Sequence, residues 1–241
     1  MSKKEESTEL ASWQQALVAD ATKVAHNEGS DSMAVKIQHG HLMYRDQPIP
    51  NDELSVVVIA SSTERCYYDQ AYDADVITSP ACFAQSLDSH NLTPHPNVAS
   101  PQHETCTGCP MAEFGSAKQG KGPACKTYRK LVFMPADTQA ENVATADLAY
   151  LKVSPTSVKN WQFYCQQLVA SAGIPPWAAT TQIKVVPDKK TMWQVLFSAI
   201  APLQDDALLS AIHGRIEAAE EIIMQPYTYD EDEGTNESKN Y

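Results

Sequence analysis

Residues 79–122 constrain this chain more than any other part of its sequence. They show little hydrophobic periodicity and are rich in Pro, Gly, Ser, Asn and His. An irregular segment of that length is uncommon inside a compact domain, so we expect something besides the main hydrophobic core to order it. Cysteines lie within the segment and close to both of its ends. A bound metal ion is therefore the first hypothesis.

The cysteine spacing favours zinc. Cys106 and Cys109 form a C-x2-C pair, in which two thiolates can bind one ion while Gly108 permits a tight turn. Cys125 supplies a third ligand, and a structural zinc takes four. The candidates for the fourth are Cys82, His90, His95 and His103. We favour Cys82, because a ligand where a strand enters the segment would join its two ends.

The alternatives are free or disulfide-bonded cysteines and a catalytic zinc. The N-terminus has no apolar region typical of a secretory signal, so we expect a reducing compartment, where metal binding is the better interpretation. A nucleobase deaminase needs H-x-E and then P-C-x-x-C, whereas here the glutamate directly follows His103 and the proline follows Cys109. We therefore predict one structural Zn²⁺, no catalytic residues and no enzymatic activity. A zinc hydrolase or nuclease would need an open metal position and a carboxylate base.

Charge is unevenly distributed along the chain. The net charge of −12 argues against a nucleic-acid partner, since affinity for phosphates comes from Lys and Arg. Half of it, however, lies in residues 220–241, and residues 114–135 contain five cations and no acid. Glycine-rich backbone with interleaved lysines can approach a phosphate chain, although such a stretch is often only a solvated loop. Nearby aromatic side chains could stack on bases. The predicted DNA-binding residues are Lys118, Lys121, Lys126, Arg129, Lys130, Tyr67, Tyr68 and Phe114.

Periodicity predicts the order of elements. It indicates helices over residues 8–27, 154–173 and 203–224, a hairpin around Gly40, and strands over residues 54–61, 64–78, 129–135, 144–154, 180–187 and 191–200. Trp161 and Trp193 are assigned to the core. The pattern is α+β or mostly β, compatible with an OB-like barrel that carries a zinc-stapled loop insertion. The predicted domains are an N-terminal helix (1–30), the zinc-containing domain (31–225) and a disordered acidic tail (226–241).

A family resemblance supports these expectations. The run CTGCPMAEFGSAKQGKGPACKTYRKLVF, with SVVVIASSTERCYYDQAYDADVITSPACF before it, resembles a group of tailed-phage proteins. Their pattern joins P-x-C, C-x-x-C-P, W/F-G-S and G-K-x-x-x-C-K-x-x-R segments. The resemblance covers roughly residues 30–200 and implies a zinc-containing single-stranded DNA-binding protein of OB type. Phe114 stands where Trp is expected, and Pro123-Ala124 where Lys-Ala is expected. The resemblance assigns metal positions to Cys82, Cys106, Cys109 and Cys125, and basic positions to Lys121, Lys126 and Arg129.

The acidic C-terminus is similar to the tails of replicative single-strand binders. It could compete for the protein's own basic groove or dock replication or recombination proteins. We expect a cytoplasmic protein, in the host cytoplasm if phage-encoded, with no membrane partner, because no run approaches the roughly 18 apolar residues of a membrane helix. The alternative function is a non-enzymatic, zinc-stabilised protein-interaction module. Binding to oligo-dT that falls steeply with salt would distinguish the two.

Overall fold

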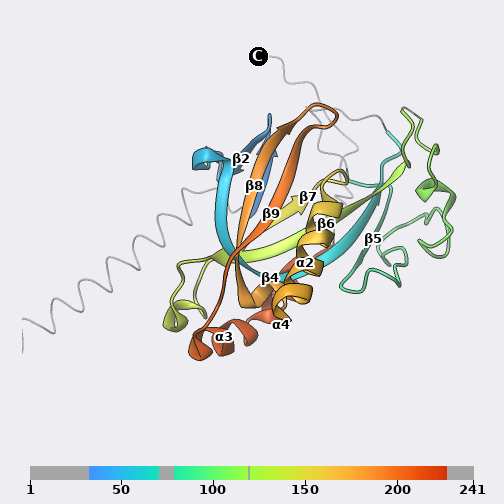
Figure 1. The fold of residues 1–241 in the computed structure, drawn as a ribbon. Coiled ribbons are helices and arrows are strands. Elements are labelled where there is room, and N and C mark those ends of the chain that lie inside the picture. The colour runs from blue at the N-terminus through green and yellow to red at the C-terminus, as the bar shows by residue number, and fades with distance from the viewer. Residues whose placement is uncertain (1–32, 71–78, 119, 227–241) are drawn as a thin grey trace, which may run out of the picture.

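The computed structural model describes residues 33–70, 79–118 and 120–226, and its centre is a nine-stranded, strongly curled sheet (Figure 1). The order is β3-β2-β1-β7-β6-β4-β8-β9, with β5 paired to the far half of β4. All neighbours are antiparallel except β1 and β7. The strands are β1 (Ala34–Gln38), β2 (His41–Tyr44), β3 (Gln47–Pro48), β4 (Glu53–Tyr67), β5 (Cys82–Ser86), β6 (Cys125–Pro135), β7 (Ala149–Val153), β8 (Ala179–Asp188) and β9 (Met192–Pro202).

Three α-helices lie among the described residues: α2 (Val158–Ala172), α3 (Asp206–His213) and α4 (Ile216–Ile223). Short 3₁₀ turns are η1 (Pro50–Asp52), η2 (Pro110–Ala112), η3 (Ala140–Asn142) and η4 (Pro176–Ala178). None of the helices in the described ranges has the length and apolar character needed to cross a bilayer. The helix expected over residues 8–27, the domain boundary at residue 30 and the tail beyond Pro226 lie outside the described residues. The strand-rich α+β class is confirmed.

Strand β4 organises the sheet. Its first four residues pair with β8 and its last five residues pair with β5, while β6 pairs with β4 from Val56 to Tyr67. The sequence predicted two strands here, with a break near residue 62. That prediction is wrong, because the polar residues that follow the apolar run continue the ladder with β6. A bulge between Val58 and Ala60 lets this long strand bend.

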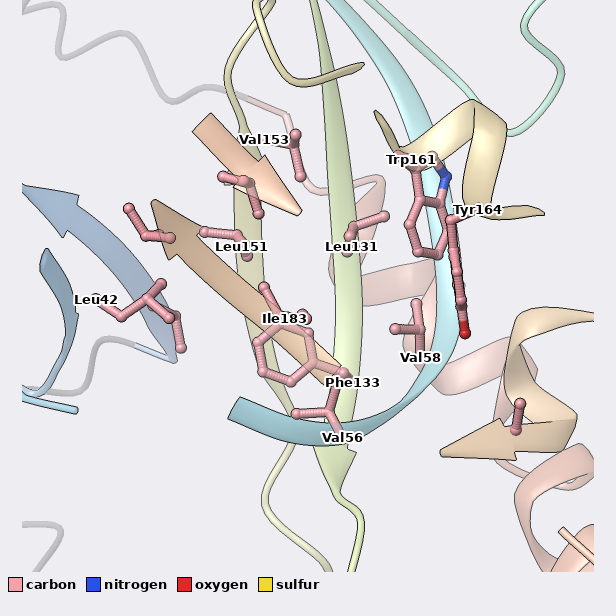
Figure 2. Close-up of a cluster of buried hydrophobic side chains, with 14 of the residues drawn as sticks. Leu42, Val56, Val58, Leu131, Phe133, Leu151, Val153, Trp161, Tyr164 and Ile183 are labelled. Carbon is pink, nitrogen blue, oxygen red and sulfur yellow. The ribbon is translucent and has the colours of Figure 1, made fainter. Parts of the chain in front are cut away.

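The inner face of the sheet carries the main core. Here "inner face" means the side that bears Leu131 and Val153 and packs against α2; the other side is the outer face (Figure 2). Trp161 is 2% exposed and Trp193 is half-buried in the same cluster, as predicted. The curl brings the β1–β2 turn toward β9, since a Cβ built on Gly40 would lie 3.9 Å from the Trp193 ring.

Helix α2 ends as the sequence predicts and begins later. Gly173 closes it in the left-handed region at φ 65°, a conformation that glycine adopts without strain. Its first residue is Val158 and its N-cap is Ser157, not Ser154. Residues 154–157 instead form a turn, and the Ser157 hydroxyl accepts a hydrogen bond from the Val195 amide of β9 at 2.9 Å. That bond fixes the helix start against the sheet.

The outer face is covered by α3 and α4, where Val132 and Met134 pack against Ile212, Ala219 and Ile223. The sequence predicted one helix over residues 203–224, and this is corrected to two. The chain breaks at Gly214 and Arg215, and the Arg215 guanidinium donates hydrogen bonds to the carbonyls of Val143 and Ala146. A residue bound to a neighbouring loop in this way fixes the kink where glycine already weakens the helix.

Candidate metal centre and nucleic-acid interface

Two predicted zinc ligands lie at strand starts on the inner face. Tyr67, the last residue of β4, pairs with Cys82 of β5 on one side and with Cys125 of β6 on the other. Directly opposed residues point to the same face of a sheet, so these two cysteines flank one tyrosine. The irregular segment between them is thus anchored at both ends by the sheet.

That segment also has hydrophobic anchors, which the sequence analysis missed. Leu92 and Cys106 are buried against Ala84 on the inner face of β5, and the Cys106 amide donates a hydrogen bond to the Leu92 carbonyl at 3.0 Å. On the outer face, Val98 packs against Phe83. The segment therefore wraps both faces of the edge strand β5. The lone Leu and Val residues responsible carry no periodic signal in the sequence.

All four predicted thiol ligands line one small cavity beside Tyr67. Its volume is about 20 Å³ measured with a water-sized sphere, and room for one such sphere needs roughly 10–15 Å³. His103 lines it too. Among the described residues, however, no three Cys, His, Asp or Glu side chains already stand as a metal-ligand group. The cysteines lining the cavity are Cys82, Cys106, Cys109 and Cys125.

The competing histidines differ in their surroundings. His90 is exposed and its ring nitrogen lies 3.2 Å from an Asp88 carboxylate oxygen. The His95 ring stacks on Phe83 with centroids 4.7 Å apart. Neither lines the cavity, whereas His103 does, with its Nδ1 turned to the Thr105 backbone. His103 accordingly remains the only histidine of the three in a position to compete with Cys82.

Two of the cavity thiols, those of Cys106 and Cys125, have perturbed pKa values. Burial, together with the neighbouring Cys106, raises the pKa of the Cys125 thiol to about 12. Burial likewise raises the pKa of Cys106, and in both cases the Arg65 guanidinium acts in the opposite direction. Cys106 and Cys125 therefore stay protonated at neutral pH unless a metal ion displaces their protons, and thiolates are the soft ligands that zinc takes in structural sites. The donor set therefore suits zinc.

The predicted basic residues divide between a loop and a strand. Lys118 and Lys121 are exposed on the loop, and Lys118 donates a hydrogen bond to the Asp69 carbonyl at 3.2 Å. Lys126, Arg129 and Lys130 belong to β6, not to a flexible loop. Alternation along a strand puts Lys126 and Lys130 on the outer face and Arg129 on the inner face. The sequence treated all five as one surface, and that grouping is wrong.

Outer-face cations stand over tyrosine rings. Lys130 Nζ lies 4.8 Å from the Tyr150 ring centroid, and Lys152 Nζ lies 4.3 Å from that of Tyr128. Lys152 also pairs with Glu64, which is 2% exposed. Burial lowers the pKa of Lys152, but the nearby Cys66 and Glu64 outweigh it and the net pKa is raised. The sequence analysis had not selected Lys152, because its partners come from two other strands.

Inner-face arginines lie between the core and the cysteine cavity. Arg129 pairs directly with Thr63, and Arg65 pairs with Thr127 one step nearer the cavity. Arg65 Nη1 donates a hydrogen bond to the Cys106 carbonyl. Burial lowers the pKa of Arg129, against a small opposing effect of Cys165 on α2. Arg65 was not among the predicted DNA-binding residues.

The predicted stacking residues are unequally available. Phe114 is 81% exposed on the irregular segment, and Tyr68 is 39% exposed just after β4. Tyr67 is half-buried between its cysteine neighbours and packs against the Phe83 cluster. Phe114 and Tyr68 can therefore offer a ring face to a base, whereas Tyr67 serves mainly as packing.

Comparison of the chain with protein-family models, with curated proteins and with solved structures found no match.

Proposed function

We propose that this protein binds single-stranded DNA without strong sequence preference, as part of phage replication or recombination. The observation that carries the proposal is a local reversal of charge. Adjacent segments of β4, β6 and β7 bear five cations and one carboxylate, Glu64, in a chain whose net charge is −12. Clustered Lys and Arg bind phosphates and release counterions, which supplies sequence-independent affinity. Three of these cations, Lys126, Lys130 and Lys152, lie on the outer face of the sheet, and two, Arg65 and Arg129, lie on the inner face.

Aromatic residues beside these cations support a single-stranded ligand over duplex DNA. Phe114 and Tyr68 are exposed, and stacking on an unpaired base contributes about 1–3 kcal/mol per base. Duplex DNA keeps its bases stacked inside and gains nothing from such rings. Preference for single strands therefore follows from the chemistry of the surface.

Zinc has a structural role in this proposal. Cys82, Cys106, Cys109 and Cys125 would hold one Zn²⁺, which supplies tetrahedral coordination and fixes the irregular segment against β4–β6. The segment carries Phe114, Lys118 and Lys121, so the metal would hold those side chains near the strand-borne cations. A rigid loop loses less conformational entropy when DNA binds.

The OB-like interpretation of the sheet is part of the same proposal. An OB barrel is a small, partly open β-barrel that binds oligonucleotides on one face. The curled sheet is similar in having β1–β2 and β8–β9 approach each other, although in the described residues no strand pairing joins β2 or β3 to β9. A protein-interaction module is the second candidate. It is favoured by the long edge strand β9, whose Leu196 and Ile200 are 41% and 54% exposed.

Fluorescence anisotropy with labelled oligo-dT over a range of salt concentrations tests the proposal. Binding should be tighter than to duplex of equal length, and log K should fall linearly with log salt. Changing Lys126 and Lys130 together to Gln should flatten that slope by up to about 0.7 for each phosphate that the variant no longer neutralises. Absence of oligo-dT binding by the wild type at low salt would leave the interaction-module hypothesis in its place.

A further inference from the structure

Three buried polar atoms on the inner face have no hydrogen-bond partner within the described part of the chain. They are the Nε atoms of Arg65 and Arg129 and the hydroxyl oxygen of Thr63. Buried polar groups are nearly always paired, so each exception needs an explanation. These three occupy one small region, because Thr63 faces Arg129 directly and Arg65 is diagonal to Arg129 across the same two strands.

No carboxylate in the described part of the chain balances these arginines. Neither forms an ion pair with any described residue. The residues nearest to them on the same face of β4, β5 and β6 are Ser, Thr, Tyr, Cys, Ala and Leu, and α2 contains no Asp or Glu. A half-buried guanidinium without a counter-charge is costly. An ordered water could satisfy the hydroxyl but not the two positive charges.

The region has two walls. Arg129 lies near Cys165 of α2, since each influences the pKa of the other, and burial raises that of Cys165 to about 11. Arg65 reaches the Cys106 carbonyl on the opposite side. The floor between them is the β4–β6 ladder, in front of which α2 lies (Figure 1). Both arginine side chains are only half-buried, so a ligand can reach them from solvent, whereas Thr63 is 4% exposed.

We infer that Arg65, Arg129 and Thr63 bind one backbone phosphate of the DNA strand on the inner face of the sheet. This rests on the proposed function and adds a specific contact to it. A phosphodiester provides two unesterified oxygens, which match the planar donor fork of a guanidinium, and a hydroxyl can donate to the same group. The strand would pass between α2 and the cysteine-containing segment, not only over the outer-face lysines.

Substitution of Arg129 gives the clearer test, because Arg65 also affects the pKa values of thiols in the cavity. Arg129→Met removes the charge and keeps a side chain of similar length. Lys189→Met is the matched control, since Lys189 is an exposed lysine in the β8–β9 turn and loses the same charge. Arg129→Lys keeps the charge and removes the fork. All variants are made in the full-length protein.

We expect Arg129→Met to weaken oligo-dT binding by about tenfold or more, and to flatten the salt slope by about 0.7. Without DNA, its melting temperature should equal or exceed that of wild type, because an uncompensated buried charge has been removed. Arg129→Lys should be intermediate in affinity, and Lys189→Met should match wild type in both measurements.

Other outcomes would overturn the inference in distinguishable ways. If wild type binds oligo-dT and Arg129→Met binds as Lys189→Met does, the phosphate contact is wrong and the proposed function stands. A melting temperature below that of wild type would show that Arg129 has a structural partner. If wild type does not bind oligo-dT, both proposals fail. Stabilisation of such a protein by inorganic phosphate, abolished in Arg129→Met, would assign the pocket to a free anion.

Discussion

The two halves of β4 are similarly buried, but the side chains of the first half are apolar and those of the second half are polar. Residues 56–60 are all apolar and less than 10% exposed, with the inner core on one side and α3 and α4 on the other. Residues 62–64 are at most 4% exposed and are Ser, Thr and Glu. The first half supplies stability. The second half leaves the Ser62 and Thr63 hydroxyls without a hydrogen-bond partner among the described residues, which is the arrangement found where a fold gives up stability for a ligand.

The largest expected effect lies at the end of the polar half, where Cys82 and Cys125 flank Tyr67. Cys109→Ser should abolish binding of one zinc per chain, because a structural site with three ligands left loses most of its affinity. The segment from residue 87 to 124 should then become sensitive to limited proteolysis while the sheet stays folded. Metal analysis under reducing conditions measures the first effect.

Two controls sharpen this test. Cys165→Ser, on α2, should keep the metal, as should His103→Ala if Cys82 is the fourth ligand. Loss of zinc in His103→Ala with retention in Cys82→Ser would reverse that assignment. A wild-type protein that purifies without any metal would refute the zinc hypothesis altogether.

In the apolar half, Ile59→Ala should reduce the free energy of unfolding by about 2–5 kcal/mol. Ile59 is 3% exposed and packs against α3 and α4, so its loss leaves a cavity between sheet and helices. Chemical denaturation measures the change. Metal content and oligo-dT affinity of the folded fraction should be unaffected, and a change in either would mean that the two halves are coupled.

In the polar half, Glu64→Gln should reduce the free energy of unfolding by a smaller amount, about 1–3 kcal/mol. Lys152 is partly exposed, so its ammonium group can be solvated by water once the carboxylate is gone. The loss depends on pH. The pKa of Lys152 is raised in the folded protein, so its pairing with Glu64 stabilises the fold below the ordinary lysine value of about 10.4. This stabilisation is lost as the pH rises through the raised pKa of Lys152. The stability difference between wild type and Glu64→Gln should therefore shrink above about pH 10, and a constant difference would exclude this ion pair as its source.

The smallest effect should come from the acidic C-terminus. Deleting residues 227–241 removes most of the local negative charge and should tighten oligo-dT binding a few-fold at low salt. The gain should disappear as salt rises, since both contacts are screened over a Debye length of about 10 Å at 0.1 M. Equal affinity of the truncated and full-length proteins at low salt would show that the tail does not compete with DNA.

The sequence predicted where helices and strands lie better than it predicted which face of the sheet each side chain occupies. Periodicity and Gly173 located α2, and Gly40 located the first hairpin, because these signals are local. Alternation within the predicted strand 129–135 already separates Arg129 from Lys130. A strand that starts at Cys125 also puts Lys126 on the face of Lys130. Arg65 could not have been found in this way. Its place beside Arg129 and Cys106 depends on the β4–β6 register, which one sequence does not reveal.

The candidate metal site was predicted from spacing, and its four cysteines do line one cavity. Metal occupancy stays a prediction. The sequence assigned the order of the irregular segment to zinc alone, whereas Leu92 and Val98 also anchor it. Isolated apolar residues among prolines and serines give no pattern, so these anchors become visible only once β5 is present to receive them.

The pairing of β4 with β6 also determines how this chain can fold. Val56 meets Pro135, so the central ladder joins residues far apart in the sequence and encloses the whole irregular segment. Closing such a loop has an entropic cost that precedes the first hydrogen bond of the ladder, and proteins dominated by distant pairings fold slowly. The β1–β2 and β8–β9 hairpins have short turns and can form early. The rate of refolding should therefore be limited by the pairing of β6 with β4, which follows formation of the two hairpins.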